Sequence, residues 1–194
     1  MRPALRSFAA VLLAAWLLPV AAQSLDKPVI LLAAPGAAAE ALGSIVLVVA
    51  PVSDGGHVGF IINRPSDVTL GELFPEQSLS RKVTRPVYLG GPVNPNLLFA
   101  LVQRQESPGG NSFQMMPGLY AAYETAVVER VIGSDPEHAR FVAGLFLWQP
   151  GELQREIDLG AWLVLEGDAA LVMRNPGRLW DELVLRWQQR GNSV

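Results

Sequence analysis

Two apolar runs separated by a short turn-rich segment place the strongest constraint on the fold of this chain. Residues 44–50 read SIVLVVA and residues 58–63 read VGFIIN, while the intervening residues 51–56 read PVSDGG. Runs of this length that are rich in Val and Ile and lack polar alternation are typical of strands buried on both faces. The turn residues between them predict a β-hairpin at the centre of a sheet.

The rest of the chain alternates between strand-like and helix-like segments. Further strands are expected over residues 28–32, 86–89, 97–103, 119–123, 145–148 and 161–165. Helical segments are expected over residues 69–74, 125–132 (ended by Gly133), 137–142 (with Asp135 as N-cap), 150–160 and 176–190, and residues 37–42 suit a short helix or an ordered loop. The expected fold is therefore a single α+β domain, with a mixed, mostly antiparallel sheet flanked by helices.

The N-terminal segment has the three parts of a secretory signal peptide. Arg2 and Arg6 precede the apolar run FAAVLLAAWLL at residues 8–18, and Val20-Ala21-Ala22 supplies small residues before Gln23. The run is too short to span a bilayer, which takes about 20 apolar residues. We expect residues 1–22 to be cleaved after Ala22, leaving residues 23–194 as one periplasmic or secreted domain without a transmembrane span. A short uncleaved anchor or a buried helix is the alternative.

Composition excludes several kinds of site. The chain has no cysteine, which removes disulfides, metal–thiolate centres and cysteine nucleophiles, and its two histidines are too few for a His-rich metal centre. With 15 basic and 18 acidic residues the net charge is −3, which argues against a protein that binds nucleic acid by neutralising phosphates. No metal, no cofactor and no nucleic-acid partner are therefore expected.

Two short motifs are candidates for ligand binding. Asn63 and Arg64 follow a buried strand, and a guanidinium suits a carboxylate or phosphate; alternatively, Arg64 pairs with a surface carboxylate at a simple turn. Gly90 and Gly91 could form a backbone nest for an anion, although a tight turn that needs positive φ is the more economical interpretation.

Three further side chains are candidates for acid–base or ligand chemistry. His57 could act as a base, but no nucleophile is assigned to it. Glu152 and Glu156 lie four residues apart on one helical face and could share a proton or a cation, or form a solvated face offset by Arg155. His138 is expected to be solvated. The expected core or interface anchors are Trp148, Trp162, Trp180 and Trp187.

Several segments, in this order and spacing, resemble the bacterial YqgE/AlgH family. The most specific is residues 56–65, GHVGFIINRP, and the next is residues 86–93, PVYLGGPV. Similar blocks stand at residues 31–35 (LLAAP), 44–46 (SIV) and 144–148 (GLFLW), then at Gly151-Glu152-Leu153 with Glu156 and at Ala161-Trp162-Leu163. The resemblance covers nearly all of residues 28–190. Departures include Pro51-Val52 where the family usually has Glu-His, and Asn96-Leu97-Leu98-Phe99 where it usually has Arg-Gly-Phe.

The resemblance implies a compact fold with helices on both faces of a sheet and no established enzymatic activity. Members are mainly cytosolic and often labelled transcriptional regulators, so cytoplasmic location and transcriptional regulation are alternatives. The leading hypothesis is a non-catalytic binding protein, or an accessory or regulatory protein, of the bacterial cell envelope. Its partner would be another protein or a small ligand at a cleft near Asn63, Arg64 and Gly90. A hydrolase that uses His57 with Glu152 or Glu156 is the other alternative.

Overall fold

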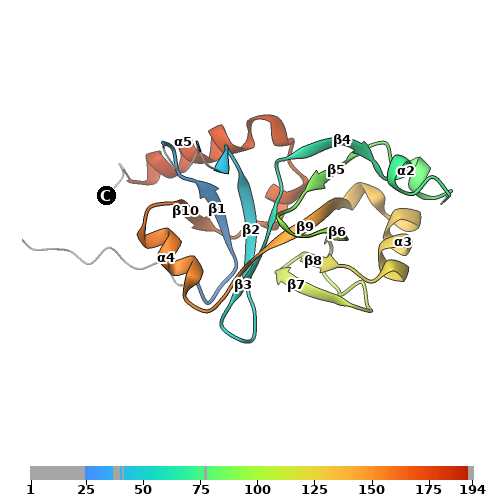
Figure 1. Cartoon of the computed structure of the whole chain (residues 1–194), viewed down its shortest axis with the longest axis horizontal. Coiled ribbons are helices and arrows are strands. Elements are labelled where there is room, and N and C mark those ends of the chain that lie inside the picture. The colour runs from blue at the N-terminus through green and yellow to red at the C-terminus, as the bar shows by residue number, and fades with distance from the viewer. Residues whose placement is uncertain (1–24, 37–39, 41, 77, 192–194) are drawn as a thin grey trace, which may run out of the picture.

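A single curled β-sheet organises the protein in the computed structural model, which describes residues 25–36, 40, 42–76 and 78–191. The strand order is β10-β1-β2-β3-β9-β6-β8-β7, with β4 and β5 attached beside β9 (Figure 1). All pairings are antiparallel except that of β5 with β9, which confirms the predicted α+β fold. The expected signal peptide, and residues 37–39 and 41 of the expected helix or loop, lie outside the described residues.

The predicted central hairpin is confirmed. It is formed by β2 (Val46–Pro51) and β3 (His57–Ile61), which pair antiparallel from Leu47↔Ile61 to Pro51↔His57. Every residue of the two strands is buried except Pro51, as the continuous apolar runs require. β1 (Val29–Ala33) lies against β2, and β10 (Trp162–Glu166) lies against β1.

Two helices cover opposite faces of this half of the sheet. α5 (Leu179–Gly191) packs Leu179 and Leu183 on the face that carries Ile30, Leu32 and Val48. α4 (Glu152–Asp158) packs Leu153 on the other face, against Leu31, Leu47, Trp148 and Trp162. Alternate residues of β1 and β2 thus enter two separate cores, which explains why their sequences show no polar alternation.

The second half of the sheet consists of β6 (Val93–Gln103), β8 (Leu119–Ala122) and β7 (Ser112–Met116). β7 contacts β2, so the sheet curls back on itself and encloses the face that α5 covers. α3 (Thr125–Ser134) and α2 (Leu70–Leu73) pack on the outer face and cover Ala100 and Val102 of β6 (Figure 1). α3 continues past Gly133, which was expected to end it.

β9 (Ala139–Trp148) joins the two halves, and part of it was predicted wrongly as a helix over residues 137–142. Only a single 3-10 turn, η2 (Pro136–His138), forms there, and the Asp135 side chain makes no capping hydrogen bond. The Asp-Pro signal is shared by helices and 3-10 turns, whereas residues 139–148 alternate between the cores on both faces of the sheet. Pairing with three other strands therefore decides the conformation.

Several shorter elements complete the fold. β4 (Pro65–Thr69), which was not predicted, pairs with β5 (Pro86–Leu89), and η1 (Ser80–Lys82) lies between them in the chain. β7 was also not predicted. η3 (Ala169–Met173) and η4 (Pro176–Arg178) precede α5. Within the described ranges, no helix is both long and apolar enough to cross a membrane.

Candidate functional site

Asn63 and Arg64 are held by the main chain that leads into β2. The Asn63 side chain accepts a hydrogen bond from the Val46 amide and donates one to the Ser44 carbonyl, both at 2.8 Å. Its carboxamide thereby extends the β2–β3 pairing beyond Ile61. The Arg64 guanidinium donates to the Leu42 carbonyl at 2.8 Å. Among the described residues it forms no ion pair with a carboxylate.

Gly90 lies where β3 and β9 diverge. Its N–H donates to the Ala143 carbonyl at 2.7 Å, and its own carbonyl accepts from Ile61 at 2.8 Å. Neither Gly90 nor Gly91 has a positive φ, so the expected turn with a positive φ at these glycines is wrong. Gly144, which packs against both of them, has a φ of 74°. A Cβ on Gly90 would overlap the Gly144 carbonyl oxygen, so the glycines permit a close approach of two backbones.

His57 begins β3 at the opposite end from Asn63. Its Nε2 atom lies 3.1 Å from the Leu25 carbonyl oxygen, which assigns the ring proton to Nε2. Nδ1 is buried without a hydrogen-bond partner among the described residues. Neither ring nitrogen is therefore hydrogen-bonded to Glu152 or Glu156, the carboxylates with which a catalytic His57 was expected to act.

The Glu156 carboxylate accepts hydrogen bonds from two indole N–H groups of the core. Its Oε2 atom accepts hydrogen bonds from Trp148 at 3.0 Å and from Trp162 at 2.7 Å. The two rings are perpendicular and buried, as expected of core anchors. Glu152 instead accepts from the Gln149 amide at 2.8 Å and lies 4.0 Å from Arg155. The two glutamates therefore have separate structural partners.

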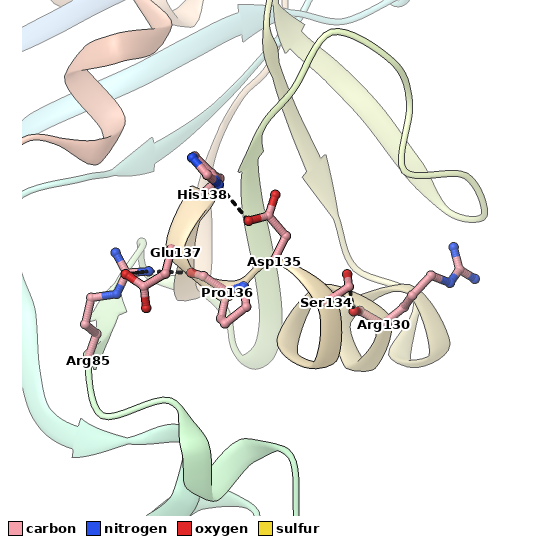
Figure 2. A network of polar contacts seen from close by, with 7 residues as sticks. All are labelled: Arg85, Arg130, Ser134, Asp135, Pro136, Glu137 and His138. Atoms are coloured by element: carbon pink, nitrogen blue, oxygen red, sulfur yellow. Dashed lines mark hydrogen bonds and ion pairs between the residues drawn. The ribbon is translucent and has the colours of Figure 1, made fainter.

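The surface around η2 carries the other histidine. His138 Nδ1 lies 2.6 Å from Asp135 Oδ1, and both side chains are exposed, as expected for His138 (Figure 2). Arg85, which precedes β5, contacts Glu137 of this turn at 3.6 Å and donates a hydrogen bond to the Pro136 carbonyl. Across the described ranges, no group of three or more acidic or histidine side chains is placed to hold a metal ion.

A groove of about 510 Å³, here called the sheet groove, opens where β3, β6, β7 and β9 meet. It was not predicted from the sequence. Phe99, Phe113 and Tyr123 form a chain of aromatic contacts within it, with centroid separations of 5.9 and 6.5 Å. Its lining consists of Pro51, Val52, Ser53, Val58, Asn94, Leu97, Phe99, Phe113, Gln114, Tyr123, Leu145 and Leu147.

A break in the pairing of β6 with β9 shapes this groove. Val93 pairs with Leu145 and Leu98 pairs with Ala143, so β6 has extra residues between the two pairs. Within this bulge Asn94 has a φ of 49°, the one positive φ of a non-glycine residue in the described chain. The bulge leaves Leu97 exposed beside Leu147 of β9. The sequence signal was Asn94-Pro95-Asn96, because proline cannot donate to a strand ladder.

The sheet groove continues toward α3. A second cavity of about 200 Å³ shares Leu97 and Tyr123 with it and extends to Phe74 and Ile132. The combined surface is therefore elongated and mainly apolar. On the main groove, three uncharged polar side chains come from three different segments, namely Ser53, Asn94 and Gln114, and none of these side chains is hydrogen-bonded to another described residue.

Comparison with known proteins agrees with the sequence resemblance. A family model described as AlgH-like matches residues 30–190. A UPF0301 protein of Myxococcus xanthus is 35% identical over 133 residues, covering 66% of this chain and 72% of that protein. One from Paraburkholderia phymatum is 32% identical over 151 residues, covering 75% of this chain and 79% of that protein.

Two solved structures share the fold. The solution structure of the AlgH protein from Pseudomonas aeruginosa superposes with a TM-score of 0.70 at 24% identity, covering 86% of this chain and 92% of that chain. A crystal structure of a protein from Corynebacterium diphtheriae gives a TM-score of 0.65 at 24% identity, covering 83% and 86% of the two chains. The family model, the sequence relatives and the shared fold together show that this chain belongs to the AlgH-like family.

Proposed function

We propose that this protein is a non-catalytic binding protein of the bacterial cell envelope, and that it holds an elongated, uncharged and mainly apolar ligand in the sheet groove. The groove volume of about 510 Å³ falls within the range of small-molecule sites, roughly 300–1,000 Å³. Apolar and aromatic side chains with a few polar groups are the usual lining of such sites. Among the described residues, no charged side chain lines the main groove, which favours an uncharged ligand.

The observation that carries this proposal is the bulge around Asn94. A left-handed backbone at a residue other than glycine costs free energy, and bulges and strained residues concentrate near functional sites. Here the bulge interrupts an otherwise regular pair of strands at the point where Leu97 and Asn94 line the groove. A regular β6 would pair residues 94–97 with β9, and Asn94 and Leu97 would then not line the groove.

The contacts of the polar residues that the sequence offered as binding or catalytic candidates support a non-catalytic role. Asn63, Arg64 and Glu156 each make hydrogen bonds that hold the main chain or the core. Location in the envelope is proposed from the sequence of residues 1–22, which has a signal-peptide pattern. The absence of cysteine also suits an oxidising compartment.

Titration with an uncharged fluorescent probe, N-phenyl-1-naphthylamine, tests the groove. Saturable fluorescence enhancement is expected with the unmodified protein. Leu147→Asp should weaken binding at least about tenfold, because a carboxylate would face the apolar ligand and the contact area of a leucine would be lost. Leu147 is 49% exposed, so this change should leave the fold intact.

Leu159→Asp is the matched control, since Leu159 is 85% exposed and does not line the groove. It should bind the probe as the unmodified protein does. Equal probe affinity of the Leu147→Asp and unmodified proteins would overturn the assignment of the groove. Turnover of any substrate in a broad hydrolase panel, if abolished by His57→Ala, would overturn the non-catalytic role.

A further inference from the structure

A buried arginine lies in a separate cavity, which shares no lining residue with the sheet groove. Arg140 of β9 is only 7% exposed, and its guanidinium lies 4.2 Å from the centre of the Tyr88 ring. It donates hydrogen bonds to the carbonyl oxygens of Ile62 and, at 2.8 Å, Arg174. No carboxylate among the described residues forms an ion pair with it.

The cavity beside Arg140, here called the arginine cavity, has a volume of about 290 Å³. Arg85, which precedes β5, and Arg174, which follows η3, also line it. The remaining lining residues are Pro86, Tyr88, Ala139, Phe141, Met173, Asn175 and Pro176, so no acidic side chain is among them. Arg85 contacts Glu137 (Figure 2) and Arg174 contacts Glu182, but neither glutamate lines this cavity.

The charge of Arg140 is only partly compensated. Burial lowers the pKa of its guanidinium from the ordinary value; Tyr88 opposes this shift and the positive charge of Arg85 adds to it. Two neutral carbonyl groups and an aromatic face stabilise a buried cation less than a charged partner does. The two hydrogen bonds also use only two of the five N–H groups of the guanidinium.

We propose that the arginine cavity binds the phosphate group of a small ligand. An anion beside Arg140 would supply the missing counter-charge and accept its remaining N–H groups. Three arginines from separate segments line the cavity, a set that suits the several oxygens of a tetrahedral dianion better than the two coplanar oxygens of a carboxylate. The volume is at the lower end of ligand-binding cavities, which limits the rest of the ligand to a few atoms.

Calorimetric titration of the purified protein at constant ionic strength tests this proposal. Inorganic phosphate is expected to bind saturably with half-saturation below about 1 mM, and acetate at least about tenfold more weakly. Methyl phosphate distinguishes a phosphomonoester from free phosphate as the source of the bound group. Tighter binding than inorganic phosphate would indicate a phosphomonoester, whereas weaker binding would indicate free phosphate.

Two variants link this binding to the cavity. Arg140→Met removes the buried charge and should weaken phosphate binding at least about tenfold. If that variant does not fold, the double change Arg85→Ala and Arg174→Ala at exposed positions provides the same test. Arg155→Ala, an exposed arginine on α4 outside the cavity, should bind phosphate normally.

Three results would overturn the phosphate site. These are no saturable binding of phosphate, equal binding of acetate, and unchanged phosphate binding by a folded cavity variant. Because the cavity and the sheet groove share no lining residue, loss of phosphate binding in these variants should leave the affinity for N-phenyl-1-naphthylamine unchanged. The two proposals therefore fail independently.

Discussion

Glu156 shows how one side chain can fix two large core residues at once. Its Oε2 atom accepts hydrogen bonds from Trp148 on β9 and Trp162 on β10, which lie on either side of the β1–β2–β3 strands. Both indoles are buried, so each N–H would lose its hydrogen bond to water without this carboxylate. Glu156 thus ties α4 to the sheet and satisfies two buried donors.

Removing this carboxylate should destabilise the protein. Glu156→Ala leaves two buried indole donors without a partner, so we expect the free energy of unfolding to fall by about 2–4 kcal/mol. Glu156→Gln retains one carbonyl acceptor and should cost less, about 1–2 kcal/mol. Urea denaturation followed by tryptophan fluorescence measures both. Glu137→Gln, at a carboxylate 81% exposed, should change stability by less than about 0.5 kcal/mol.

Among the elements, β9 determines how the two halves of the sheet join. It pairs with β3 through residues 146–148 and with β5 through Val142 and Ala143, while β6 lies along its other edge. The change of partner occurs at Gly144, where the backbone has a φ of 74° and approaches Gly91 closely. This junction tolerates no side chain at Gly144.

Gly144→Ala should therefore be much more destabilising than the same substitution at a glycine that has open space around it. A Cβ at Gly144 would overlap the Gly91 carbonyl oxygen, and we expect a loss of more than about 3 kcal/mol in the free energy of unfolding. Gly151 has a similar φ, 79°, but no atom within 4 Å of a built Cβ, so Gly151→Ala should cost about 1–2 kcal/mol. Similar losses in chemical denaturation would contradict the proposed close approach.

The short helix α2 provides a pH-dependent prediction. Thr69 and Glu72 form a reciprocal capping box, and the hydrogen bonds from the Thr69 amide and hydroxyl lower the pKa of Glu72. This contribution to stability should be present above the unfolded-state pKa and be lost as the pH falls through the lower folded pKa. An NMR titration of Glu72 should show the lowered pKa, and Thr69→Ala should raise it toward its ordinary value.

Sequence patterns predicted the elements whose burial follows from their own local composition. The continuous apolar runs indicated the hairpin because only a strand covered on both faces accommodates them. The segment from Asp135 to Val142 was misassigned because its conformation depends on pairing with residues far away in the chain. Arg140 was missed for the same reason, since its partners Ile62, Tyr88 and Arg174 are brought together only by the fold.

At the scale of the whole molecule, the curled sheet separates the two proposed sites. The sheet groove lies where β3, β6, β7 and β9 meet, whereas the arginine cavity lies between β5, β9 and the segment before α5. The residues first considered for binding are placed differently. Asn63, Arg64 and Gly90 hold the strand junction next to Ile62, which accepts from Arg140. None of these three residues lines the sheet groove or the arginine cavity.

The proposed export predicts where the mature protein is found and at which residue it begins. If residues 1–22 act as a signal peptide, the mature protein should begin at Gln23 and be recovered from the periplasm or the medium. Fractionation followed by N-terminal sequencing measures both properties. Ala22→Arg should block cleavage, because a small residue is required immediately before the cleavage site. Recovery of the uncleaved, unmodified chain from the cytoplasm would contradict the envelope location.

The central claim, that the sheet groove binds an uncharged apolar ligand, is tested most directly by mapping NMR chemical-shift changes during titration with N-phenyl-1-naphthylamine. We predict saturable changes confined to the groove, strongest at the Asn94–Leu97 bulge, Tyr123 and Leu145–Leu147 of β9. Amides of α4 and around Leu159 should not change. Saturable changes centred elsewhere, or no changes at the bulge when the probe is bound, would contradict the claim.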